Sequence, residues 1–212
     1  MGRMEDQIKQ QPPLAAPYWD IAPRPSGDSL RHRPSGWQIL ISETLETILL
    51  AAVIWLVVNF ATARFVVDGS SMEPNFHTGQ LLIVNRLAYR FGTLERGDVI
   101  VFQYPNNTAD DYIKRVIGLP GEKVTIRDGK VYVNDVLLDE PYLVPDTILP
   151  YGGEWVVPPD NYFVMGDNRA HSSDSRSWGM LGKEFVIGKS WISYWPPKYW
   201  GVVPHYSYED SP

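Results

Sequence analysis

The 212-residue chain contains no cysteine, which excludes disulfide bonds, thiolate zinc ligands and a cysteine nucleophile. It also lacks clusters of basic residues: 19 Lys and Arg stand against 25 Asp and Glu, for a net charge of −6. Such a chain is poorly suited to bind a phosphate backbone, so we expect no nucleic-acid partner. No spacing typical of a zinc site and no glycine-rich phosphate loop is present. The sequence therefore predicts neither a metal nor a cofactor.

Long helical patterns are missing from most of the chain, whereas Pro and Gly are frequent, at 18 and 17 residues. Frequent turns favour a mainly β body over a helical bundle. Asp128-Gly129 lies between two strand-forming runs, which predicts a hairpin with a type I′ turn. Short apolar runs recur between turn signals, at 81–84, 99–102, 124–126, 131–133, 162–165 and 185–187. We predict one antiparallel β domain over residues 66–200, followed by a tail at 201–212.

The N-terminal part differs in composition from this body. Residues 1–40 are rich in Pro, Gln and Ser and are predicted to form a disordered tail. Residues 47–63 carry no charge, and a helix over them would be about 25 Å long, close to the ~30 Å of a hydrocarbon core. We therefore predict a single transmembrane signal anchor at residues 41–65. Ala61-Thr62-Ala63 also has the small-x-small form of a cleavage site, and the sequence leaves open whether it is cut.

Three polar segments carry residues suited to catalysis. In the run Gly69-Ser70-Ser71-Met72-Glu73-Pro74, Ser71 could act as a nucleophile, because Gly69 permits unusual backbone angles and free amides could hold an oxyanion. Lys114 lies among apolar neighbours, and burial would lower its pKa toward that of a base near neutral pH. The third segment is a dense polar run at 166–179. Taken singly, each also fits a plain structure: a loop, a surface lysine on an edge strand, and a solvated loop.

Histidine is the alternative base. His171 is the one histidine inside a dense polar motif, and Asp174 follows it, so a Ser71-His171-Asp174 triad is conceivable. However, Asp and His three residues apart on one short loop rarely form an oriented relay. This favours Lys114 as the base, in the Ser-Lys variant of the triad.

Taken in order along the chain, these motifs resemble the type I signal peptidases, and most closely their Gram-positive, cyanobacterial and organellar branch. The resemblance covers about residues 40–200 and lies in the stretches 69–74, 96–102, 114–122, 166–176, 188–191 and 194–196. It implies a membrane anchor followed by an antiparallel β-sheet catalytic domain. It also implies a serine endopeptidase that removes signal peptides from exported preproteins. Cleavage would follow small residues at the −1 and −3 positions and pass through an acyl-enzyme.

The resemblance also implies catalytic roles. Ser71 is the implied nucleophile, Lys114 the general base, and Ser172 the residue that hydrogen-bonds and orients the lysine amine. Two supporting ion pairs are implied beside them: Asp174 with Arg176, and Asp167 with Arg115.

Oxyanion and substrate contacts follow from the same resemblance. The backbone amide of Ser71 would supply one oxyanion donor, whereas Gly69 stands where other members carry a second, serine donor. Met72, Tyr112 and Ile113 match positions that wall the substrate pockets. Asn75 stands where threonine is usual, and we expect this change to affect the turn rather than the chemistry.

The implied setting is a single-pass protein of a bacterial plasma membrane, or of a thylakoid in a cyanobacterium, with preproteins and the lipid bilayer as partners. Arg31 and Arg33 before the anchor, against Arg64 after it, favour a cytoplasmic N-terminus and an exported catalytic domain. The alternative is a catalytically inactive, membrane-tethered β domain that binds partners. The joint presence of nucleophile, lysine and orienting serine argues against that alternative.

Overall fold

The computed structural model describes residues 36–145, 147, 149, 152–206 and 208, and the chain divides into two units, residues 1–49 and 50–212. Most of the predicted N-terminal tail lies outside the described residues. Helix α1 (Gly36–Ala61) is the one helix of the described part that is long and apolar enough to span a membrane, and none of its most apolar window is buried within the protein. It fits the single predicted span but begins at residue 36 rather than 41.

The predicted anchor ends too late. Residues 62–65 belong to strand β1 (Thr62–Val66), which pairs antiparallel with β2 (Leu81–Asn85) from Thr62 opposite Asn85 to Val66 opposite Leu81. Phe65 and Val66 suit a strand as well as a helix, and the pairing with β2 decides between them.

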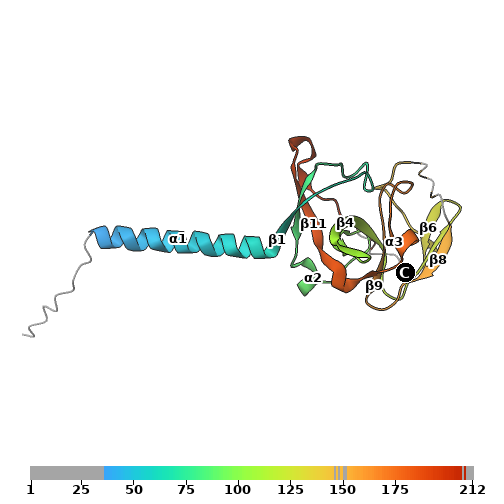
Figure 1. Cartoon of the computed structure of the whole chain (residues 1–212), viewed down its shortest axis with the longest axis horizontal. Coiled ribbons are helices and arrows are strands. Elements are labelled where there is room, and N and C mark those ends of the chain that lie inside the picture. The colour runs from blue at the N-terminus through green and yellow to red at the C-terminus, as the bar shows by residue number, and fades with distance from the viewer. Residues whose placement is uncertain (1–35, 146, 148, 150–151, 207, 209–212) are drawn as a thin grey trace, which may run out of the picture. The chain divides into compact units, whose positions relative to one another are not determined.

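All paired strands of the described residues are antiparallel, which confirms the predicted mainly β fold (Figure 1). The larger sheet has the order β1, β2, β11 (Val186–Trp195), β3 (Val99–Tyr104), β4 (Asn107–Gly118), β9 (Asn161–Met165) and β10 (Leu181–Gly182), with β12 (Gly201–Val202) paired to β11. Short helical turns connect its strands: α2 (Ala88–Phe91), α3 (Ser175–Trp178), η2 (Lys183–Phe185) and η3 (Pro197–Tyr199).

A smaller sheet has the order β7 (Val136–Leu137), β6 (Lys130–Val133), β5 (Lys123–Arg127) and β8 (Gly153–Val156). Its central hairpin is the predicted one: Arg127 pairs with Lys130, and Asp128 and Gly129 have φ values of 51° and 71°, as a type I′ turn requires. The predicted apolar runs at 81–84, 99–102 and 162–165 also lie within strands, whereas 185–187 spans the end of η2 and the start of β11.

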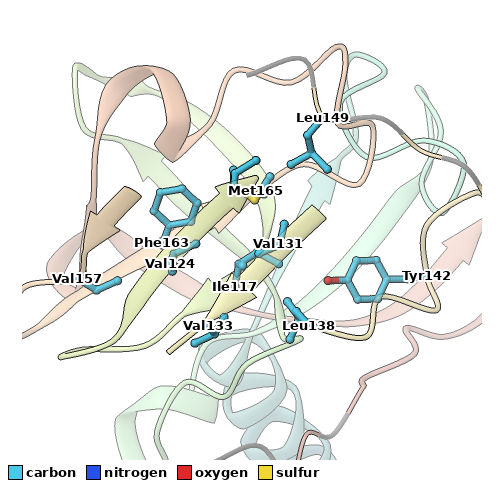
Figure 2. Packing of buried hydrophobic residues seen from close by; sticks show 11 residues of the cluster. Ile117, Val124, Val131, Val133, Leu138, Tyr142, Leu149, Val157, Phe163 and Met165 are labelled. Atoms are coloured by element: carbon cyan, nitrogen blue, oxygen red, sulfur yellow. The ribbon is translucent and has the colours of Figure 1, made fainter. Parts of the chain in front are cut away.

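The two sheets share a hydrophobic core. Ile117 of β4 and Phe163 of β9, from the larger sheet, pack with Val124 and Val131 of the hairpin (Figure 2). Each of these side chains is at most 1% exposed. This packing joins the hairpin to the strands that carry the polar site segments.

The predicted C-terminal tail joins the fold over much of its described length. Gly201 and Val202 form β12, and Val203 is buried in the core cluster that contains Met72. Tyr206 and Tyr208 pack against the core shared by the two sheets. The apolar Val203 and the rings of Tyr206 and Tyr208 explain why this segment packs against the domain.

Candidate active site

The candidate site opens onto a groove with a volume of about 540 Å³. Two stretches of chain line most of it, residues 65–71 and residues 109–114 of β4. Leu82, Val101, His171 and Ser173 complete the lining. The groove is thus bounded by extended or irregular backbone with both apolar and polar side chains, a surface suited to a peptide chain.

Ser71 and Lys114 meet at this groove although 43 residues separate them in sequence. Lys114 belongs to β4, opposite Ile100 of β3, and Ser71 lies in a turn preceded by Gly69 with φ of 90°. The lysine Nζ donates hydrogen bonds to Ser71 Oγ and to the Ile113 carbonyl, each at 2.8 Å. This contact between a hydroxyl and an amine is the geometry that a lysine base requires.

The Lys114 side chain is buried, with the residue only 4% exposed. Burial lowers its pKa to about 8, although the carboxylates of Asp174 and Asp167 oppose the shift. A substantial fraction of the amine is therefore neutral at mildly alkaline pH.

The segment after β9 packs against the turn that carries Ser71. A side chain at Gly166 would overlap the Ser71 carbonyl and Ser172 Oγ, so only glycine fits this approach. The Asn168 backbone N–H donates to the Ser71 carbonyl at 3.0 Å, and its side-chain amide donates to the Ser70 carbonyl at 3.1 Å.

Both ion pairs implied by the resemblance are formed. Asp167 accepts from Arg115 at 2.7 Å, with side chains 0% and 1% exposed. Asp174 accepts from Arg176 at 2.8 Å and from the Gly166 N–H at 3.0 Å. Mutual pairing explains how so dense a polar segment is buried.

The hydrogen bond expected from Ser172 to the lysine amine is not formed. Ser172 Oγ is buried and has no hydrogen-bond partner within the described part of the chain. The two donor bonds of Lys114 go instead to Ser71 and to its neighbour's carbonyl.

The alternative triad has no support in the geometry. His171 lines the groove, but no hydrogen bond joins its side chain to Ser71 or Asp174 among the described residues. The Asp174 carboxylate is already occupied by Arg176 and by the Gly166 N–H.

Of the three predicted pocket residues, Tyr112 and Ile113 line the groove and Met72 does not. The Met72 side chain is 1% exposed and packs among Val67, Phe76 and other apolar residues, because its thioether side chain turns into the core. Phe65 and Val67, which the sequence did not indicate as pocket residues, also line the groove.

Sequence reasoning also missed two asparagines. Besides Asn168, Asn75 donates through its side-chain amide to the Tyr142 carbonyl and to Asp167, each at 2.8 Å. The one signal in the sequence was that Asn75 replaces a usual threonine. We expected this change to affect only the turn, but the Asn75 side chain also contacts Asp167. No group of three or more His, Asp or Glu side chains able to hold a metal occurs in the part of the chain that the structure describes.

A serine hydroxyl held against a buried lysine amine at an open groove is the arrangement of a serine hydrolase. Comparison with protein families matches residues 41–195 to the family described as signal peptidase, peptidase S26. The chain belongs to this family and is therefore a serine endopeptidase whose substrates are preproteins with signal peptides.

Individual relatives agree. A signal peptidase I of Bacillus caldolyticus is 41% identical over 152 residues, which cover 66% of this chain and 82% of the relative. A probable signal peptidase I-2 of Synechocystis is 37% identical over 168 residues, covering 77% and 76%. A crystal structure of a signal peptidase I from Enterococcus faecalis is 34% identical, with a TM-score of 0.42, and covers 46% of this chain and 96% of that one. The resemblance to Gram-positive and cyanobacterial members is confirmed.

Proposed function

We propose that the chain removes signal peptides from exported preproteins with Ser71 as nucleophile and Lys114 as general base, cutting after small residues at −1 and −3. The observation that carries this proposal is the 2.8 Å contact between Lys114 Nζ and Ser71 Oγ beside a peptide-sized groove.

The chemistry proceeds in two steps. Neutral Lys114 takes the proton of Ser71 Oγ as the oxygen attacks the scissile carbonyl, and the resulting ammonium protonates the leaving amine. The mature protein departs with a free amino terminus, and the signal peptide stays esterified to Ser71. Lys114 then takes a proton from a water that attacks the ester carbonyl. The bond between the acyl carbon and Ser71 Oγ breaks, Lys114 returns its proton to Ser71 Oγ, and the signal peptide leaves with a carboxyl terminus that ionises to a carboxylate.

Groove chemistry supports the choice of small residues. Tyr112, Ile113 and Phe65 present bulky walls, which would exclude large side chains by steric overlap. Ser71 would supply one oxyanion donor through its backbone N–H, and Gly69 contributes no side-chain donor. Ser172 is proposed to orient the neutral amine, because a buried hydroxyl without a partner is costly unless it serves a state such as this one.

The setting is part of the proposal. A single span with a cytoplasmic N-terminus would place the groove on the exported side, where signal peptides emerge. We propose the lipid bilayer as the partner of α1 and expect no nucleic acid or metal to take part.

Cleavage of a preprotein with an Ala-x-Ala site, by the full chain in detergent, tests the proposal. Wild type should cut after the −1 alanine, as mapped by mass spectrometry, and Ser71→Ala and Lys114→Ala should lose cleavage while staying folded. Lys123→Ala is the matched control, because Lys123 forms only a surface pair with Asp135. Equal cutting by Lys114→Ala would remove the lysine from the mechanism, and no cutting by wild type would favour a tethered binding domain.

A further inference from the structure

Asn168 holds the backbone of the nucleophile at two successive carbonyls. Its main-chain N–H donates to the Ser71 carbonyl at 3.0 Å, and its side-chain Nδ2 donates to the Ser70 carbonyl at 3.1 Å. The peptide unit that joins Ser70 to Ser71 is therefore fixed from its carbonyl side by a residue almost 100 positions away.

The other side of the same peptide unit carries the Ser71 N–H. In a planar trans peptide the N–H points opposite to the carbonyl, so fixing one direction fixes the other. Within the described residues the Ser71 N–H donates no hydrogen bond to the protein. A free N–H on the nucleophile is the donor that a developing oxyanion needs.

We propose that Asn168 is a positioning residue for the oxyanion hole: its side-chain amide, bonded to the Ser70 carbonyl, aims the Ser71 N–H at the oxyanion of the scissile carbonyl. This inference rests on the proposed function, since it assumes that Ser71 attacks a peptide carbonyl. The sequence motif alone does not indicate this role, because Asn168 contacts the backbone carbonyls of Ser70 and Ser71 and not their side chains.

The hold is effective because Asn168 is anchored to the strand that carries the base. Its neighbour Asp167 is fully buried and pairs with Arg115, which directly follows Lys114 on β4. Asn75, at the far end of the nucleophile turn, donates to the same Asp167 carboxylate. The same buried pair, Asp167 with Arg115, therefore holds both the proposed oxyanion donor and the proposed general base in place.

A local bond does not replace this anchor. The Glu73 N–H also donates to the Ser70 carbonyl, at 3.1 Å, but it belongs to the same turn and moves with it. Gly69 offers no side-chain donor, so the aim of the Ser71 N–H has more weight here than in a site with two donors.

The test uses the full chain in detergent and a preprotein peptide with an Ala-x-Ala site. Asn168→Ala should lower kcat about 10- to 100-fold with KM changed less than about twofold. The alkaline rise of the pH profile should stay in place, because Lys114 is untouched. Asn168→Asp, which keeps the shape and the main-chain bond but turns the donor into an acceptor, should show a similar loss and decides the matter if the alanine variant does not fold. Asn161→Ala is the matched control, since its amide donates at 2.8 Å to Pro159 outside the groove.

A second measurement distinguishes a misplaced Ser71 N–H from a general disturbance of the site. A peptide aldehyde that adds to Ser71 creates an oxyanion, so its affinity should fall by the same factor as kcat/KM in the Asn168 variants. Binding of the same signal peptide with a C-terminal amide, which forms neither a tetrahedral oxyanion nor a carboxylate, should not change.

Wild-type kcat in Asn168→Asp, or unchanged aldehyde affinity beside a reduced kcat, overturns the positioning role. Those results leave the peptidase assignment intact. Absence of cleavage by wild type instead removes the proposed function, and this inference with it.

Discussion

Lys114 is a cation that folding removes from water. Its pKa of about 8, set by burial, lies well below the 10.5 of a free lysine. Each unit of such a shift corresponds to about 1.4 kcal/mol, so the charged amine costs the folded state about 3 kcal/mol at neutral pH. The proposed base is thus held at the expense of stability.

Activity should follow the neutral fraction of this amine. Below about pH 8 the amine is mostly protonated and cannot accept the Ser71 proton. We expect kcat/KM to rise about tenfold per pH unit below this pKa and to level above it. Initial rates on an Ala-x-Ala peptide between pH 6 and pH 10 measure this, and a profile governed by a group near pH 6 would point to histidine instead.

Removing the buried charge should stabilise an inactive protein. Lys114→Met keeps a long unbranched side chain but removes the charge, and we expect its free energy of unfolding at pH 7 to exceed that of wild type by about 1–3 kcal/mol. Between pH 8 and pH 10.5 the unfolded chain binds the lysine proton and the folded chain does not, so wild-type stability rises with pH and the difference narrows. Urea unfolding at pH 7 and pH 10 gives both values, and a difference that widens with pH would contradict the assignment.

Gly166 lies so close to its neighbours that no side chain fits there. An added Cβ meets the Ser71 carbonyl and Ser172 Oγ, so Gly166→Ala should lower stability by about 1–3 kcal/mol and displace the nucleophile turn, with loss of cleavage. Gly201→Ala is the control, because its Cβ meets nothing within 4 Å. Unfolding curves and cleavage rates of the two variants should differ clearly, and similar values for both would show that the loop yields easily.

At the scale of elements, the sequence predicted correctly those elements that depend on neighbouring residues alone. Asp128-Gly129 fixed its hairpin because positive φ at both positions suits these residues. Residues 62–65 were assigned to the anchor instead of β1, because an apolar run fits a helix or a strand equally well and the partner strand β2 lies about 20 residues away in sequence. The contacts of Asn168 were unpredictable for the same reason, since a polar loop carries no mark of the backbone that it binds. The pairing of Ser71 with Lys114 was predicted from the resemblance to a known family, and the spacing of the two residues in sequence did not indicate it.

The C-terminal segment also places the aromatic ring of Tyr206 beside Arg115 and Tyr142. The Arg115 guanidinium lies 4.0 Å from the Tyr142 ring centroid and 5.4 Å from that of Tyr206, whose ring lies 5.2 Å from Tyr142. Tyr206→Ala should therefore lower the free energy of unfolding by about 2 kcal/mol. Tyr206→Phe keeps the ring and should stay close to wild type in urea unfolding, so an equal loss in both variants would assign the effect to the hydroxyl.

Across the whole molecule, the absence of cysteine makes membrane topology directly measurable. Gly36→Cys and Gly201→Cys each introduce a single thiol at an exposed position, one at the start of α1 and one in the β domain. With a cytoplasmic N-terminus, a membrane-impermeant maleimide should label only the Gly201→Cys protein in intact spheroplasts. Permeabilised cells should label both, and the reverse pattern in intact cells would invert the proposed orientation.

The close contact between the Gly166 loop and Ser71 has a consequence for the chain while it is being synthesised. The nucleophile turn leaves the ribosome about 100 residues before the loop that holds it, and the ring of Tyr206 that faces Arg115 comes later still. A nascent chain therefore contains Ser71 and Lys114 before the segments that align them have been synthesised. We expect the enzyme to remain inactive until its own translation is nearly complete.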